Sequence, residues 1–407
     1  MRLLIGLLLF AALAAGDVAR LHELAETRQL FLLRDVLQQP GWNKAETLFY
    51  RGMVESRFGQ EPKGIDDLTR FLLSHPSPDG QRNAYEELAG ALKREGRYGE
   101  AARNLTEALR LTPAGERPDI VNSRDLYAAL AGVPPQSVAF GKDVPVRATV
   151  NELGSWDVPV DVNGRRGQWI FDTGANWSTL SAGEAERLGL EVRESDAYVR
   201  GSTGKKNALR LAVADDLQFG RAHLKHVVFL VLSDESLFVG PLKYQMHGFL
   251  GLPVIRSLGQ VGIAANGDLR IEPGRTAKGA PNLFFDGLTP IVEVEHGDHR
   301  MQMFLDTGAN ASSLYRSFRS VLTKDEIDGL TVRDEKTGGA GEIVVGRTES
   351  VRTLHLSVSG RPVELSDVGL LATAPEGETR YRNGVLGTDA LGRGFTIDFR
   401  AMQLRLE

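Results

Sequence analysis

The sequence predicts a multidomain protein of α plus all-β class, in which an N-terminal helical-repeat domain precedes two homologous β-rich lobes. Apolar residues recur at helical spacing up to about residue 130, and after Pro134-Pro135 they alternate as in strands. The pentapeptide Asp-Thr-Gly-Ala-Asn then occurs twice, at 172–176 and at 306–310, each time after an apolar run. Two identical pentapeptides in equivalent surroundings indicate a duplicated unit.

The composition is typical of a globular protein with more than one domain. The chain has 407 residues, of which 42% are hydrophobic and 25% are charged, and this length allows two or three domains. A formal net charge of -5, without long runs of like charge, gives no reason to expect a nucleic-acid partner. The chain contains no cysteine, which excludes disulfides and thiolate chemistry.

The N-terminus has the layout of a secretory signal peptide. Arg2 precedes an apolar stretch, Leu3 to Leu13, that ends in small residues, and cleavage before Asp17 would remove residues 1–16. An uncleaved anchor is the less favoured alternative, because the stretch is shorter than the ~20 residues that span a bilayer. We therefore expect an exported protein, periplasmic or secreted, with no membrane association after cleavage. Export without disulfides fits a bacterial periplasm.

Residues 17–132 are expected to form a small helical domain. Amphipathic spacing begins with Leu21, Leu24, Leu30 and Leu33. Further on, apolar, small and breaker residues recur at the spacing of a two-helix unit, at Leu88, Leu92, Gly96, Tyr98, Ala101, Leu105, Ala108 and Pro113, with a poorer copy at Gly52, Gly59, Gly64, Leu68, Phe71 and Pro76. This spacing resembles that of tetratricopeptide repeats, whose small residues let two helices pack closely. Simple scaffolding and binding of a protein partner are equally open as its role.

The region after Pro134-Pro135 repeats one order of features. A strand with alternating valines, a hairpin turn and a short apolar strand precede the first pentapeptide, and the same features precede the second. Each half also has a later apolar-apolar-Gly segment, at Phe249-Leu250-Gly251 and Val385-Leu386-Gly387. We place the two lobes at 144–273 and 282–407, with the linker between them.

This two-copy pattern resembles the aspartic protease superfamily, the pepsin-like and retropepsin-like enzymes. The resemblance covers about Val144 to Glu407 and implies an active site between the lobes. The residues that it carries over are the catalytic Asp172 and Asp306 and the supporting Thr173, Gly174, Thr307 and Gly308. In such enzymes the threonines hydrogen-bond across the lobe interface, and the glycines leave room for a backbone amide beside each carboxylate.

Two carboxyl groups held close together retain one shared proton, because both cannot ionise cheaply. The ionised group can act as general base on a water molecule, while the protonated group hydrogen-bonds to the substrate carbonyl. The expected function is that of an aspartic endopeptidase, a hydrolase acting on a peptide or protein substrate without cofactor or metal. A monomer is expected, since one chain supplies both aspartates. The alternative is a peptide-binding or scaffold protein that keeps the fold without turnover.

Small-residue loops in each half are candidate flaps over a bound peptide. They comprise Gly201, Ser202, Thr203 and Gly204 in the first half and Gly338, Gly339, Ala340 and Gly341 in the second. His296 and His299 fall in a turn, so we expect solvated side chains there and not metal ligands. The triplets at 176–178 and 310–312 match glycosylation acceptors, a match that we interpret as coincidental because a glycan there would obstruct the cleft.

Overall fold

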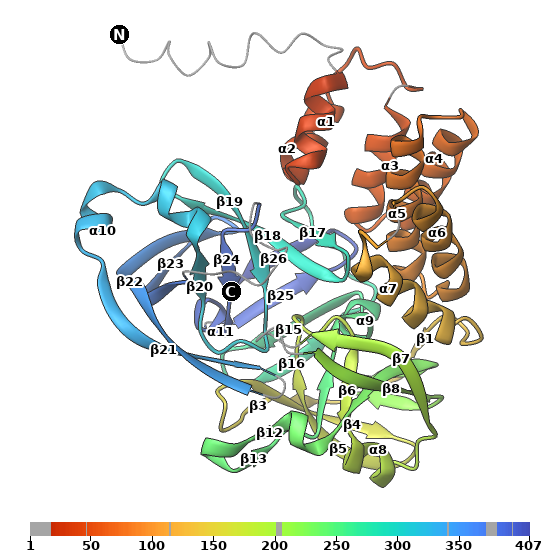
Figure 1. Ribbon diagram of the computed structural model, residues 1–407. Coiled ribbons are helices and arrows are strands. Elements are labelled where there is room, and N and C mark those ends of the chain that lie inside the picture. Colours follow the sequence, from red (N-terminus) through yellow and green to blue (C-terminus); the bar gives the residue numbers. More distant parts are fainter. Residues whose placement is uncertain are drawn as a thin grey trace.

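The computed structural model describes residues 18–45, 47–113, 115–200, 206–339, 342–371, 381–392 and 394–407. A helical N-terminal part packs against a larger region of curved sheets (Figure 1). This arrangement confirms the predicted α plus all-β class. The predicted signal peptide at 1–16, the flap candidates Gly201, Ser202, Thr203 and Gly204, and the candidates Ala340 and Gly341 lie outside the described residues.

Helices form where the amphipathic spacing predicts them. They are α1 (Val18–Glu26), α2 (Leu30–Leu37), α3 (Leu48–Arg57), α4 (Glu61–Leu73), α5 (Pro78–Arg94), α6 (Tyr98–Arg110) and α7 (Pro118–Ala129). Helices α3 and α4 approach most closely at two glycines. A Cβ added to Gly52 would lie 2.7 Å from Leu68 Cγ, and one added to Gly64 would lie 2.6 Å from the Gly52 oxygen. The expected close packing of two helices at small residues is therefore found here.

The first half of the β-rich region is built on one sheet around the first pentapeptide. Its strands are β1 (Ser137–Phe140), β3 (Thr149–Val150), β4 (Trp156–Val162), β5 (Arg165–Phe171), β6 (Ser178–Ser181), β7 (Val192–Arg200), β8 (Lys206–Ala214), β9 (Leu217–Phe219), β10 (Ala222–Lys225), β11 (Val227–Leu232) and β14 (Gly248–Leu250). Short helices α8 (Ala182–Arg187) and α9 (Leu252–Ser257) and a small hairpin of β12 (Phe238–Val239) and β13 (Tyr244–Gln245) complete it. Asn163 and Gly164 both have positive φ, 53° and 75°, as the predicted β4–β5 hairpin turn requires.

The second half has its own sheet around the second pentapeptide. Its strands are β17 (Leu283–Asp286), β18 (Thr289–His296), β19 (His299–Leu305), β20 (Ser313–Tyr315), β21 (Thr331–Gly339), β22 (Glu342–Val358), β23 (Arg361–Leu371) and β24 (Gly384–Leu386), with helices α10 (Lys324–Asp328) and α11 (Thr388–Leu391). The strand before each pentapeptide pairs in parallel with the apolar-apolar-Gly strand, β5 with β14 and β19 with β24. The strand after it pairs antiparallel with that same strand, β6 with β14 and β20 with β24. The same pairing pattern therefore surrounds both pentapeptides.

A third sheet joins the ends of the two halves. It has the order β2 (Val146–Arg147), β16 (Asp268–Ile271), β15 (Gln260–Ala264), β25 (Gly394–Asp398) and β26 (Gln403–Leu406). Antiparallel pairing of β15 with β25 links the closing hairpin of the first half to that of the second. The two halves thus share backbone hydrogen bonds as well as a side-chain interface.

The expectation of a solvated His296 is wrong. His296 is buried, its Nδ1 lies 2.9 Å from the His355 carbonyl oxygen, and its Nε2 lies 3.2 Å from Glu326 Oε2. The reason is that the end of β18 also pairs with β22, and Glu326 of α10 lies against the imidazole. His299 is exposed, as expected.

Candidate active site

Each pentapeptide begins where a central strand ends. The Asp172 amide donates to the Leu250 carbonyl of β14 at 3.1 Å, and the Asp306 amide donates to the Leu386 carbonyl of β24 at 3.1 Å. Both aspartates follow strands with buried apolar side chains. Packing of these side chains fixes the position of the strand end at which each aspartate lies. The apolar-apolar-Gly segments thus hold the two loops in equivalent positions.

A buried serine completes each loop. Ser178 Oγ accepts from the Gly251 amide and Ser312 Oγ accepts from the Gly387 amide, both at 3.0 Å. Ser312 Oγ also donates to Asp389 Oδ1 at 2.6 Å. This role of the serines was not predicted from the sequence. The signal for it is that both pentapeptides are followed by one variable residue and then serine. Both serines are buried, so their hydrogen bonds within the loops explain why the glycosylation-like triplets occur at both positions.

Two fully buried threonines link the loops to each other. The Thr173 hydroxyl donates to the Leu305 carbonyl at 2.7 Å and accepts from the Thr307 amide at 3.1 Å. In the reciprocal pair, the Thr307 hydroxyl donates to the Phe171 carbonyl at 2.8 Å and accepts from the Thr173 amide at 3.0 Å. These four bonds cross between the halves directly beneath the aspartates, and both threonines are 0% exposed. They fix the separation of the two loops.

Backbone amides orient both carboxyl groups. Asp172 Oδ1 accepts from the amides of Gly174 at 2.7 Å and Ala175 at 3.0 Å. Asp306 Oδ1 accepts from the equivalent amides, that of Gly308 at 2.9 Å and that of Ala309 at 3.2 Å. Each Oδ1 is therefore held by its own loop.

The glycines show that the two carboxyl groups face each other. A Cβ added to Gly174 would lie 2.4 Å from Asp306 Oδ1, and a Cβ added to Gly308 would lie 2.6 Å from Asp172 Cγ. Any side chain at either glycine would occupy space that the opposite carboxyl group fills. The structure thus brings together all six residues singled out in the two motifs.

Burial raises the pKa of both carboxyl groups. Burial raises the pKa of Asp172, the nearby charge of Asp306 raises it further, and the sum exceeds the opposing effect of the Gly174 and Ala175 amides. Burial also raises the pKa of Asp306, although hydrogen bonds from its loop amides and with Asp172 counteract this. Two buried carboxyl groups with raised pKa values titrate as a pair, and this favours retention of one shared proton.

Further polar contacts connect each loop to the opposite half. Ser155, just before β4, donates through Oγ to the Gly308 carbonyl at 3.0 Å. Thr289 occupies the equivalent position at the start of β18, and its Oγ1 lies 3.5 Å from Asn176 Oδ1. This pair was not predicted from the sequence, because the two equivalent positions hold different residue types, serine and threonine.

Of the flap candidates, only Gly338 and Gly339 lie within the described residues. Gly338 and Gly339 lie at the end of β21 and pair with Ile343 and Glu342 of β22, so their part in substrate binding stays a prediction.

Among the described residues, no group of three or more His, Asp or Glu side chains could hold a metal ion. Within the same part of the chain, no helix has the length and apolar character needed to cross a membrane.

Residues 158–254 match the family described as aspartyl protease. The matched segment includes the first pentapeptide and Phe249-Leu250-Gly251, so this part of the chain contains an aspartic protease-like domain. Comparison with curated proteins gave no match.

Proposed function

We propose that the chain is an aspartic-type endopeptidase that hydrolyses peptide bonds with a water molecule activated between Asp172 and Asp306. The observation that carries the proposal is the opposition of the two carboxyl groups, each lying against the glycine of the other loop. The aspartyl protease match at 158–254 supports the reaction class. The raised pKa values of both aspartates support a shared proton.

A single shared proton gives the two carboxyl groups complementary roles in the first step. The ionised carboxylate of the pair accepts a proton from water as general base, and the protonated carboxyl group gives its proton to the scissile carbonyl oxygen. The water oxygen attacks the carbonyl carbon and gives a tetrahedral gem-diol. The group that accepted the water proton then passes it to the amide nitrogen, while the other group takes back a hydroxyl proton from the gem-diol. The C–N bond breaks and releases an amine and a carboxylic acid, and the pair again holds one proton. No covalent enzyme intermediate is formed.

The threonine hydrogen bonds support this mechanism through geometry. Reacting groups must be held within about 0.5 Å of a productive arrangement. The four bonds of Thr173 and Thr307 and the two amides on each Oδ1 supply that rigidity. The proposal extends to an exported monomer that acts on peptides or proteins, because one chain carries both aspartates and begins with a signal-like segment.

The test is a peptide-library assay of purified protein from acidic to neutral pH. Wild type is compared with Asp172→Asn and Asp306→Asn, and the exposed turn variant Asp298→Asn serves as the matched control. We expect each dyad substitution to reduce cleavage by about 10²–10⁴-fold or more, and the control to retain full activity. Cleavage that persists in either dyad variant would refute the assignment.

A statine-type transition-state mimic separates the enzyme from the scaffold alternative. The enzyme should bind the mimic through the dyad, so either Asp→Asn substitution should weaken binding. A scaffold protein would cleave no peptide, and its peptide binding would be the same in wild type and in both variants.

A further inference from the structure

The two active-site loops differ at one position. The sequences Asp-Thr-Gly-Ala-Asn-Trp-Ser and Asp-Thr-Gly-Ala-Asn-Ala-Ser place Trp177 where the second copy has Ala311. Both loops nevertheless make the same serine and amide hydrogen bonds. The loop conformation therefore does not need the indole, and Trp177 must be explained by its surroundings.

Trp177 contacts the helical part of the protein. Its ring packs against Tyr98, the first residue of α6, with centroids 5.6 Å apart. Trp177 is only 7% exposed and Tyr98 only 6%, so each ring covers the other. The contact places the start of α6 against the loop that carries Asp172. It explains why the first copy has tryptophan and the second has alanine.

Neighbouring polar contacts strengthen this attachment. Arg256 of α9, which follows the Gly251 segment, donates through Nη1 to the Arg94 carbonyl at the end of α5, at 2.9 Å. Arg256 Nη2 also lies 2.8 Å from Glu61 Oε1 of α4. The same Glu61 oxygen accepts from Arg94 Nε at 3.0 Å. Helices α4, α5 and α6 thus contact the first half at α9 and at Trp177, next to the pentapeptide 172–176.

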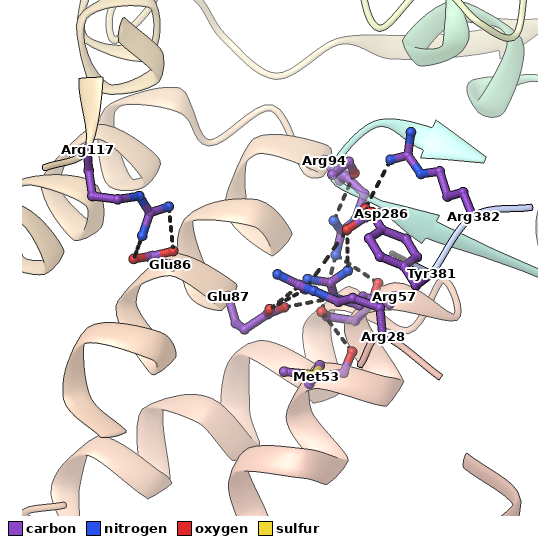
Figure 2. Close-up of polar contacts among 12 residues, drawn as sticks. Arg28, Met53, Arg57, Glu86, Glu87, Arg94, Arg117, Asp286, Tyr381 and Arg382 are labelled. Atoms are coloured by element: carbon purple, nitrogen blue, oxygen red, sulfur yellow. Dashed lines mark hydrogen bonds and ion pairs between the residues drawn. The ribbon is translucent and has the colours of Figure 1, made fainter. Parts of the chain in front are cut away.

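Helices α3 and α5 also contact the second half. Arg57 Nη1 of α3 lies 2.6 Å from Asp286 Oδ1 at the end of β17, and its Nη2 lies 2.7 Å from Glu87 Oε1 of α5 (Figure 2). Arg94 Nη1 donates to the Gly287 carbonyl at 3.1 Å. These contacts lie at the turn that leads into β18, whose first residue is Thr289.

The charges at this interface are buried, so their geometry is strongly constrained. The side chains of Arg57 and Arg94 are 7% and 3% exposed. Burial would raise the pKa of Asp286, but Arg57, Arg28 and Arg382 hold it far below its usual range. Removing one charged side chain from such a buried group leaves a neighbouring buried charge less well compensated.

We infer that helices α3 to α6 form a brace that holds the two catalytic loops in register, with Trp177 and Tyr98 as positioning residues for the Asp172 loop. The inference rests on the proposed function. It assigns the helical part a role in catalysis in addition to any partner binding. Without the ring contact, the Asp172 loop should fluctuate while the Asp306 loop, which has alanine at the same position, should not.

The experiment compares the two loops within one molecule. Trp177→Ala gives the first loop the residue that the second loop already has, and Tyr98→Leu removes the contact from the helical side. Tyr98→Phe keeps both rings. Tyr50→Ala, which alters a buried aromatic residue of a separate apolar cluster in α3, controls for general destabilisation of the helices.

Native-state hydrogen exchange is measured at the Gly174 and Ala175 amides and at the equivalent Gly308 and Ala309 amides. Trp177→Ala and Tyr98→Leu should accelerate exchange at the first pair by about tenfold or more and leave the second pair within about twofold. Tyr98→Phe should match wild type. Equal acceleration at both pairs, or at neither, would overturn the inference, as would the same asymmetry in Tyr50→Ala.

Kinetics provide the second readout. Both contact-breaking variants should lower kcat by about 10–100-fold, since misplacement of about 1 Å can cost 10²-fold, with little change in KM. Unchanged kcat in a protein that shows the exchange asymmetry would contradict a positioning role. If wild type cleaves no peptide, the proposed function fails, whereas the exchange data still decide whether the brace holds the loop.

Discussion

Replacing Thr173 by valine tests the link between the two halves without changing the volume of the core appreciably. The hydroxyl makes two bonds, one to the Leu305 carbonyl at 2.7 Å and one from the Thr307 amide at 3.1 Å. Valine has nearly the same shape and can make neither bond. The substitution leaves one buried acceptor and one buried donor without a partner.

The expected magnitude follows from those two groups. An unsatisfied buried polar group costs about 1–3 kcal/mol, so Thr173→Val should destabilise the protein by about 2–6 kcal/mol. Thr173→Ser is the matched control, because serine keeps the hydroxyl and loses one buried methyl group, at a cost of about 1 kcal/mol. Separation of the loops should also lower peptidase activity more in the valine variant than in the serine variant.

Urea unfolding of the two variants and wild type, followed by tryptophan fluorescence, gives the stability differences, and the peptide assay gives the activities. The reasoning predicts the order wild type, Thr173→Ser, Thr173→Val in both measurements. A valine variant as stable and as active as the serine variant would show that the hydrogen bonds do not link the loops in the way described.

Three further predictions concern the dyad and its support. Gly174→Ala places a Cβ 2.4 Å from Asp306 Oδ1 and should cost about 1–3 kcal/mol together with most activity; Gly132→Ala, where a Cβ meets open space in the described part of the chain, should change unfolding by less than about 0.5 kcal/mol. Asp286→Asn should cost about 3–5 kcal/mol in thermal unfolding by removing the carboxylate that Arg57 and Arg382 both contact, whereas exposed Asp66→Asn should have little effect. Asp172 has a raised pKa in the folded state, so its contribution to stability is lost as pH rises from the unfolded to the folded pKa. Asp172→Asn should therefore be more stable than wild type at neutral pH, and this advantage should shrink as the pH falls toward about 3.9, the usual pKa of Asp in an unfolded chain, and be lost below it.

The repeated parts of the site could be predicted from sequence because repetition itself carried the signal. Two copies of one pentapeptide, each after an apolar strand and before an apolar-apolar-Gly segment, were enough to expect Asp172 and Asp306 at equivalent strand ends. The serines at 178 and 312 were part of the same repetition. Their role could not be predicted, because the amides that they accept from, those of Gly251 and Gly387, lie 73 and 75 positions further along the chain.

Contacts between elements far apart in the chain left no such signal. Arg57 and Asp286 are 229 positions apart, and either residue alone has the appearance of an ordinary surface charge. Trp177 differs from Ala311 at the same position of the second copy, but the sequence does not indicate that its partner is Tyr98. The repeat spacing predicts only that Tyr98 packs between helices. The burial of His296 could not be predicted, because the sequence shows the turn near it but not that β22 and α10 cover its side chain.

The most direct test of the central claim is a double-mutant cycle on kcat/KM with Asp172→Asn, Asp306→Asn and the double variant, on the best substrate from the library. Two carboxyl groups that share one proton act as a unit, so each single substitution should remove nearly as much activity as both together. Independent effects that multiply in the double variant, or a single variant that keeps wild-type activity, would contradict the account.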